Sequence, residues 1–183
     1  MNFRTEYEKA VYDNKFRILL TQEKIDKRIR ELGKQITGDY RGKYPILIGV
    51  LNGGFIFLAD LVRQVEIDLE IDFLKISSYG NDHVSSGKVE ILKDINADIS
   101  NRHILIVEDI VDTGLSIAFL RKRMSAFKPA SLKFVTLLLK RKNAKIDCDI
   151  DYIGFDIPDE YVVGYGLDHK QILRNLPSIY VMD

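Results

Sequence analysis

The chain has 183 residues, which suits a single domain over residues 1–183. Hydrophobic residues make up 46% and charged residues 30%, so a sizeable core is expected and a largely disordered chain is disfavoured. The 27 Lys and Arg residues balance the 27 Asp and Glu residues, and this zero net charge argues against a general binder of nucleic acid or of anionic membranes.

The single cysteine and the N-terminal residues indicate in which cellular compartment the protein is expected. Cys148 is the only cysteine, so an internal disulfide is impossible and a reducing, cytoplasmic environment is expected. Residues 1–15 carry charge throughout and lack the apolar core of a signal peptide. No apolar run approaches the length of a membrane helix, so no membrane partner is expected.

The first half of the chain predicts helices and strands in alternation. A helix is expected from Thr21, which can cap its start, to Gly38, which can end it, because apolar residues recur between them at helical spacing. A short buried strand follows over 45–51. After the sequence Asn-Gly-Gly come a helical pattern over 55–62 and a strand-like alternation over 69–78.

The second half continues this alternation. Polar residues with glycine predict a loop, and apolar runs predict the strands and the helix after it. In chain order these are a loop at 79–88, strands at 88–92 and 103–109, a helix at 116–127, a strand at 131–140, and short extended segments at 151–158 and 161–168.

Strands that alternate with helices predict an α/β fold, with a mostly parallel, twisted sheet flanked by helices on both faces. Ligands of such sheets bind beyond the carboxyl ends of the strands. The segments 51–54 and 108–114 both follow predicted strands, so we expect a ligand site at that edge.

The segment ILIVEDIVDTGLSI, residues 104–117, carries the strongest chemical signal. Its apolar run ends in Glu108 and Asp109, and Asp112 precedes a turn of small hydroxyl and glycine residues. Such a turn before a helix presents backbone N–H groups and the positive end of the helix dipole to an anion. Ionised carboxylates only accept hydrogen bonds, so they suit sugar hydroxyls, a metal shell or a proton. Together these features indicate a ribose phosphate, although Asp112 alone is equally well explained as a helix cap.

Other phosphate-binding patterns fit less well. The sequence lacks the G-x-x-x-x-G-K-[ST] pattern of a Walker loop, and GYGLDH at 164–169 has only two of the three glycines of a dinucleotide fingerprint. An aspartyl-phosphate phosphatase needs two Asp separated by one residue, whereas Asp109 and Asp112 are three positions apart.

VEDIVDTG closely resembles the phosphoribosyl-diphosphate signature of the type I phosphoribosyltransferases and, among them, the hypoxanthine-guanine phosphoribosyltransferases. The resemblance runs from about Thr21 to the end of the chain, through four motifs in family order: IGVLNGGFIFLADL, SSYGND, ILIVEDIVDTG, and LLLKR followed by DYIGFDIPDEYVVGYGLDHKQILRNL. It implies Mg²⁺-dependent transfer of ribose 5-phosphate from phosphoribosyl diphosphate to N9 of hypoxanthine and guanine, which gives IMP or GMP and releases pyrophosphate. It also implies a small hood from the terminal segments and a homodimer or homotetramer.

The resemblance assigns roles to the residues around the signature. Glu108 and Asp109 would hold the 2- and 3-hydroxyls of the ribose, and Asp112 would lie near purine N7 as the general base. The 5-phosphate loop would be Thr113, Gly114, Leu115 and Ser116. Many relatives carry Lys or Arg at the position of Leu115 and Thr at that of Ser116, but backbone donors make most of the contacts to the phosphate in this loop.

The remaining motifs imply contacts to the purine and the metal. Lys140 would donate to the purine 6-oxo group, although its charge alone favours a solvated residue at a strand exit. Tyr161 would stack on the base, and the backbone of Val162 would contact the base edge. Asp168 would lie beside the purine and in the Mg²⁺ shell, which Glu108 and Asp109 would share.

The pyrophosphate and the closing loop complete the implied site. Leu51, Asn52 and Gly53 would face the pyrophosphate through their backbone, with Arg174 as a further contact. Relatives often carry Lys at the position of Asn52, and a non-proline cis bond there, so a cis bond between Leu51 and Asn52 is expected. Ser78 and Tyr79 would begin a mobile loop that closes over the site.

Two alternatives stay open. A regulatory RNA-binding protein on the same fold, like the pyrimidine-operon attenuators, would need a basic face and gives no reason for the DEYVVGYGLD motif. A transferase for xanthine or another base would share almost every motif. The neutral charge argues against the RNA-binding protein, and only a substrate panel distinguishes a xanthine transferase from one for hypoxanthine and guanine.

Overall fold

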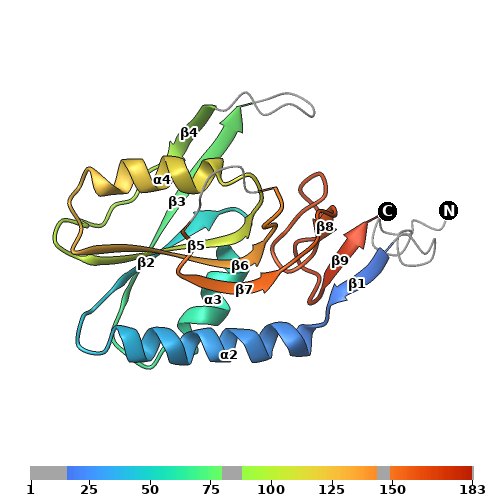
Figure 1. The fold of residues 1–183 in the computed structure, drawn as a ribbon, viewed down its shortest axis with the longest axis horizontal. Coiled ribbons are helices and arrows are strands. Elements are labelled where there is room, and N and C mark those ends of the chain that lie inside the picture. The colour runs from blue at the N-terminus through green and yellow to red at the C-terminus, as the bar shows by residue number, and fades with distance from the viewer. Residues whose placement is uncertain (1–15, 80–87, 144–148, 183) are drawn as a thin grey trace.

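The computed structural model describes residues 16–79, 88–143 and 149–182, with the backbone alone at 78–79 and 88–89. Its central sheet contains six strands in the order β4-β3-β2-β5-β6-β7 (Figure 1). These strands are β2 (Ile46–Leu51), β3 (Glu70–Tyr79), β4 (Lys88–Lys93), β5 (His103–Val111), β6 (Ser131–Leu139) and β7 (Tyr152–Asp156).

The sheet is parallel from β3 to β7, and only the edge strand β4 runs antiparallel, to β3. Helices α2 (Gln22–Asp39) and α3 (Phe55–Val62) cover one face, and α4 (Leu115–Ser125) covers the other (Figure 1). This architecture confirms the predicted fold class. It also places the carboxyl ends of the neighbouring strands β2 and β5 at the same edge of the sheet.

Strand β5 shows how the sequence fills both faces. Successive side chains of a strand point to opposite sides. Leu105 and Val107 accordingly pack in the core under α2 and α3, while Ile104 and Ile106 pack in the core under α4. A strand buried on both faces has no solvent side for a carboxylate, so the acids at its end must face a site instead of bulk water.

A second, three-stranded sheet forms the expected hood. It consists of β1 (Phe16–Leu20), β9 (Ile179–Met182) and β8 (Val162–Val163), in the order β1-β9-β8, with antiparallel pairing throughout. The terminal segments therefore lie together beside the carboxyl end of the main sheet (Figure 1). Strands β1 and β9 have no separate sequence signal, because each is short and is stabilised by a partner far away in the chain.

Most predicted boundaries are correct to within one or two residues, and the end of α2 is the instructive exception. Thr21 is the N-cap as predicted, but the helix continues through Gly38 to Asp39. The glycine with left-handed backbone is Gly42, at φ 75°, in the turn that follows. Gly38 is therefore an ordinary helical residue, and its prediction as the helix stop was wrong. Tyr79, expected in a loop, ends β3, and Lys88 begins β4 as the strand predicted at 88–92 requires; residues 80–87 lie outside the described residues.

Replacing Gly38 by alanine is expected to stabilise the protein. No atom outside the local helix lies within 4 Å of the Cβ that this substitution adds. Alanine loses less backbone entropy than glycine on entering a helix, which is worth about 0.5–1 kcal/mol. Urea unfolding of the Gly38→Ala variant should therefore show a higher midpoint with an unchanged slope, and a lower midpoint would contradict the helical assignment.

No helix among the described residues is long and apolar enough to cross a membrane.

Candidate active site

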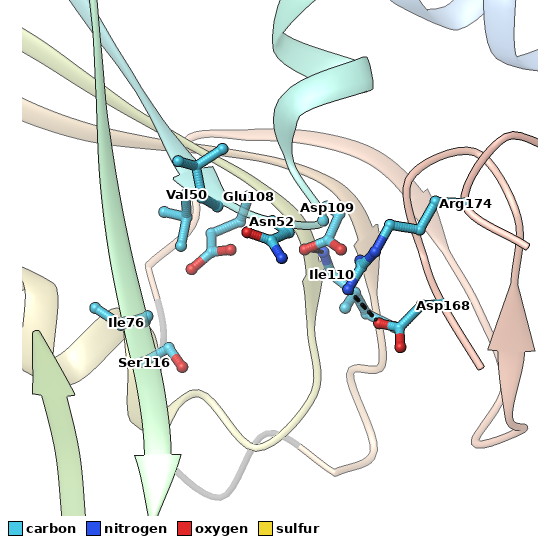
Figure 2. A pocket seen from close by; sticks show the side chains of 11 residues that line it. Val50, Asn52, Ile76, Glu108, Asp109, Ile110, Ser116, Asp168 and Arg174 are labelled. Carbon is cyan, nitrogen blue, oxygen red and sulfur yellow. Dashed lines mark hydrogen bonds and ion pairs between the residues drawn. The ribbon is translucent and has the colours of Figure 1, made fainter. Parts of the chain in front are cut away.

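A cavity of about 380 Å³ opens at the carboxyl ends of β2 and β5, where the sequence predicted a ligand site. Its lining is strongly polar, and Figure 2 shows side chains from both strands and from the hood converging on it. The predicted site residues that line it are Leu51, Asn52, Gly53, Glu108, Asp109, Ser116, Asp168 and Arg174.

The loop after β2 packs directly against the acidic end of β5. The peptide bond between Leu51 and Asn52 is cis, as predicted. Gly53 lies so close to Asp109 that a Cβ on Gly53 would be 1.6 Å from a carboxylate oxygen of Asp109. On the hood side, Gly166 has φ 96°, and its added Cβ would be 2.2 Å from the backbone oxygen of Gly53. Glycine is therefore needed at Gly53, where the loop meets β5, and at Gly166, where the hood side meets the loop.

The Gly53→Ala substitution is expected to raise the KM for phosphoribosyl diphosphate, the substrate that the sequence resemblance implies, by about 10–100-fold, because the added methyl group must displace the Asp109 carboxylate by more than 1 Å. Gly38→Ala, in open space, is the matched control. Steady-state kinetics on both variants measure the effect. An unchanged KM in Gly53→Ala would show that the position of the Asp109 carboxylate does not matter for this substrate.

Glu108 and Asp109 form an acidic pair beside Asn52 (Figure 2). Glu108 is only 6% exposed, and no hydrogen-bond donor or ion-pair partner contacts its carboxylate within the described part of the chain. Burial, and then the charge of Asp109, raise the pKa of Glu108 well above its ordinary value. Burial likewise raises the pKa of Asp109 to about 6, against the opposing hydrogen bond from the Ile110 N–H and the charge of Arg174. Such a pair gains from any ligand that brings hydroxyl donors or positive charge.

We expect the ligand-free protein to lose stability as the pH rises. Carboxyl groups with a raised pKa in the folded state favour folding below their unfolded pKa, near 4, and this contribution is lost as the pH rises through the folded pKa values of Asp109 and Glu108. Glu108→Gln removes one of these charges. In EDTA at pH 8 this variant should be more stable than the wild type by at least about 1 kcal/mol, with a smaller difference at pH 5.

Urea unfolding at the two pH values measures this difference. Glu66→Gln, which makes the same change at an exposed position, should show no comparable effect. A Glu108→Gln variant that is no more stable than the wild type at pH 8 would show that the carboxylate is satisfied without a ligand.

Asp112 is held by two donors instead of capping the helix. The N-cap of α4 is Gly114, which adopts the left-handed conformation at φ 81°, so the cap interpretation of Asp112 is wrong. Lys140 donates from Nζ to Oδ2 of Asp112 at 3.1 Å, and Asn143 donates from Nδ2 to Oδ1 at 3.0 Å. Lys140 also contacts Asp159 at 3.4 Å.

Strand register explains why Asp112 and Lys140 meet. Val111 and Leu139 are register partners of the parallel strands β5 and β6, and each of the two charged residues follows its strand by one position. Lys140 is only 8% exposed, so its interpretation as a solvated strand-exit charge was wrong. Sequence analysis missed Asn143 and Asp159, which carry no distinguishing pattern of their own.

The predicted 5-phosphate loop lies at the start of α4. Gly114 makes the turn, and the N–H of Leu115 contacts Oγ1 of Thr113 at 3.5 Å. Ser116 reaches the cavity lining from the first turn of this helix. The positive end of the α4 dipole and the backbone N–H groups at the start of this helix therefore lie near the two acids of β5, as an anion site beside hydroxyl acceptors requires.

The hood contributes the remaining predicted residues. Tyr161 is 51% exposed, and its hydroxyl donates to the backbone oxygen of Asp168 at 3.1 Å. Val162 is buried in β8, where it pairs with Val181 of β9. Arg174 binds the Asp168 carboxylate at 2.7 Å (Figure 2). Arg174 is thus a half-buried part of the cavity wall and not a surface residue.

The carboxylates fit a magnesium ion that arrives with its substrate better than a preformed metal cage. Among the described residues, no three or more His, Cys, Asp or Glu side chains are arranged to hold a metal. Mg²⁺ is usually bound by one or two protein carboxylates together with waters and substrate phosphates. Asp168, Glu108 and Asp109 all line the cavity and are the residues that would share such an ion, although Asp168 is paired with Arg174 in this structure.

The predicted closing loop begins at the end of β3. Ser78 and Tyr79 form the last two residues of β3 and pair with Val89 and Lys88 of β4. The residues that would close over the cavity fall at 80–87, outside the described residues.

A turn suited to anion binding lies at a helix start, one strand away from a glycine loop and beside Glu108 and Asp109, and this arrangement suits a phosphorylated sugar that carries a second anion. The family of phosphoribosyl transferase domains matches residues 17–170, and the chain belongs to this family. It is therefore a transferase of phosphoribosyl groups.

Within this family, the chain is similar to phosphoribosyltransferases that are named for hypoxanthine and guanine. The chain is 45% identical over 166 residues to the hypoxanthine-guanine phosphoribosyltransferase of Bacillus subtilis (strain 168), covering 91% of this chain and 92% of that one. A hypoxanthine phosphoribosyltransferase from Staphylococcus aureus superposes with a TM-score of 0.90 at 41% identity, over 94% of this chain and 95% of that one. A hypoxanthine-guanine phosphoribosyltransferase from Bacillus anthracis gives a TM-score of 0.87 at 43% identity, over 91% and 98%. The resemblance inferred from the four sequence motifs is confirmed.

Proposed function

We propose that this chain is a single-domain, Mg²⁺-dependent enzyme of purine salvage. It transfers ribose 5-phosphate from phosphoribosyl diphosphate to N9 of hypoxanthine, and of guanine, with release of pyrophosphate and formation of IMP or GMP. The observation that carries the proposal is the contact between Lys140 and Asp112 beside the anion-binding turn, which puts a donor and an acceptor within reach of one purine.

The sugar phosphate is bound by donors and acceptors of the matching kind. Backbone N–H groups at the start of α4, with the hydroxyls of Thr113 and Ser116, bind the 5-phosphate. The carboxylates of Glu108 and Asp109 accept hydrogen bonds from the ribose 2- and 3-hydroxyls. These hydroxyls supply the donors that Glu108 otherwise lacks and add to the one that Asp109 already has, which lowers the cost of keeping both acids ionised.

The leaving group is bound from the opposite side of the cavity. The backbone around Leu51, Asn52 and Gly53, together with Arg174, faces the pyrophosphate. Asp168, Glu108 and Asp109 would hold a magnesium ion together with the substrate, and that ion would supply positive charge to the departing diphosphate. The anomeric carbon becomes cationic as its bond to the diphosphate breaks, and fixed donors aimed at the departing oxygens favour that step.

The purine is bound between Lys140 and the hood. The Lys140 ammonium donates to the 6-oxo group, and Asp112 accepts the proton near N7. Tyr161, whose side chain is half-exposed, offers a ring face on which the base stacks. Backbone carbonyls near Val162 and Asp168 accept from the amino group of guanine and repel the 2-oxygen of xanthine.

The proposal includes a homodimer or homotetramer in the cytoplasm, with no nucleic-acid or membrane partner. In a structural relative, the hypoxanthine phosphoribosyl transferase of Trypanosoma cruzi at 41% identity, the C-terminal region has a role in oligomeric state and enzymatic activity. In this chain the C-terminal strand β9 pairs with both β1 and β8 of the hood. Light scattering of the purified protein measures its oligomeric state.

A substrate panel tests the proposed function. Steady-state rates with phosphoribosyl diphosphate, Mg²⁺ and each of hypoxanthine, guanine and xanthine should rank the first two well above the third, and EDTA should abolish turnover. Filter binding with RNA should detect no specific complex. Tight RNA binding without turnover would favour the regulatory alternative, and a preference for xanthine would contradict the assigned base specificity.

A further inference from the structure

A turn after β6 places Asn143 against Asp112. The side-chain amide of Asn143 donates to Oδ1 of Asp112 at 3.0 Å, while the Lys140 ammonium donates to Oδ2 at 3.1 Å. Each oxygen of this carboxylate therefore has its own donor. One donor is a neutral amide and the other is a cation, so the two hydrogen bonds have different chemistry.

The turn that carries Asn143 is anchored on several sides. The N–H of Asn143 donates to the backbone oxygen of Lys140 at 3.0 Å, and the N–H of Lys140 donates to that of Val111 at 2.9 Å. Arg141, inside the turn, forms an ion pair with Asp156 at the end of β7 at 3.1 Å. These contacts fix the base of the Asn143 side chain relative to the end of β5, so its amide is aimed at Asp112.

The two donors on Asp112 differ in what the reaction requires of them. Under the proposed function, Lys140 donates to the purine 6-oxo group, which draws its ammonium toward the base and away from Oδ2. Asn143 has no such second partner among its contacts in the described residues, and its amide remains a donor at every pH at which a protein is folded. Oδ1 thus stays occupied while Oδ2 becomes available to the purine proton.

We propose that Asn143 is a positioning residue for Asp112, whose amide holds Oδ1 and thereby presents Oδ2 to the purine ring. This inference rests on the proposed function and extends it to a residue outside the phosphoribosyl-diphosphate site. A carboxylate held by one oxygen keeps its plane and direction when the other oxygen loses its lysine partner. The expected consequence lies in turnover and not in binding of phosphoribosyl diphosphate.

The Asn143→Leu variant removes the amide at similar side-chain volume. We expect kcat with hypoxanthine to fall about 10-fold, the size of one lost hydrogen bond to a charged group, with the KM for phosphoribosyl diphosphate within about two-fold of wild type. Asn143→Gln keeps an amide on a longer chain and should recover part of the loss. Lys142→Leu, at an exposed position of the same turn, is the matched control and should leave kcat unchanged.

A double-mutant cycle separates positioning from a general structural role. In an Asp112→Asn background the carboxylate is already absent, so Asn143→Leu should cause no further loss of kcat. The inference is overturned if Asn143→Leu alone keeps the wild-type kcat, if the same loss occurs in both backgrounds, or if the loss follows a fall in melting temperature across the Leu and Gln variants. In each of these cases an active wild type leaves the proposed function intact, whereas a wild type inactive on hypoxanthine overturns both.

Discussion

The Asp112→Asn variant is expected to lower kcat by about 10²–10⁴-fold, the usual contribution of a positioned general base. An asparagine keeps the size of the side chain and one acceptor oxygen, but it does not take up a proton. The anion-binding turn at the start of α4 and the glycine loop after β2 are unaffected by this change. The affinity for phosphoribosyl diphosphate should therefore change far less than kcat does.

Single-turnover kinetics of the purified variant, together with calorimetric titration of phosphoribosyl diphosphate, measure the two quantities separately. The exposed Asp68→Asn substitution is a suitable control for the loss of one negative charge. Near-normal turnover in Asp112→Asn would remove Asp112 from the catalytic role, and its contacts to Lys140 and Asn143 would then serve the structure alone.

The second large effect is the rejection of adenine, by up to about 10⁴–10⁵-fold relative to hypoxanthine. Lys140 is only 8% exposed, and its ammonium has three donors and no acceptor. Two of those donors face Asp112 and Asp159. The 6-oxo group of hypoxanthine accepts from this ammonium, whereas the 6-amino group of adenine opposes it. A buried donor left without a partner costs about 1–3 kcal/mol, and the displaced amino group adds to that cost.

The ratio of kcat/KM for hypoxanthine to that for adenine measures the discrimination. Lys140→Met, which keeps an unbranched side chain without the charge, should lower the hypoxanthine rate steeply and leave the adenine rate nearly unchanged, so that the ratio collapses. Adenine turnover comparable to that of hypoxanthine in the wild-type protein would contradict the role given to Lys140.

The acidic strand end shows which parts of the site were predictable from local sequence. A run buried on both faces cannot end in Glu108 and Asp109 without a reason, so their chemistry was visible before any fold was known. The turn that follows has residues suited to anion binding, and the structure places it at a helix start as predicted. Local propensity and local chemistry agree over this stretch, which is why it was predicted well.

Lys140 and Asn143 show where local sequence stops being informative. Lys140 lies in a basic stretch whose composition suggests a solvated surface, and only strand register with β5 brings it to Asp112. Asn143 reaches the same carboxylate across 31 positions of sequence, through a turn with no distinctive residues. The hood strands β1 and β9 likewise depend on pairing between the two ends of the chain. Contacts of this kind follow from the tertiary fold, so resemblance to a family identified Lys140 and nothing in the sequence identified Asn143.

Gly38 illustrates the opposite error, in which a local signal was followed too closely. Glycine is common just after a helix because it adopts a left-handed backbone there, and two glycines near the end of α2 satisfied that pattern. The helix runs through Gly38 and ends at Asp39 with Tyr40 as its C-cap, and Gly42, at φ 75°, lies in the turn beyond that cap. The sequence alone offers no means of choosing between them.

The most direct test of the whole account is the product analysis of one reaction. Purified protein is incubated with hypoxanthine, phosphoribosyl diphosphate and Mg²⁺, and nucleotide and pyrophosphate are quantified together by ³¹P NMR and mass spectrometry. We predict IMP linked through N9 and pyrophosphate in equal amounts. Pyrophosphate released with free ribose 5-phosphate and no nucleotide, or no reaction at all, would contradict the assignment of the cavity, Lys140 and Asp112 to a purine phosphoribosyl transfer.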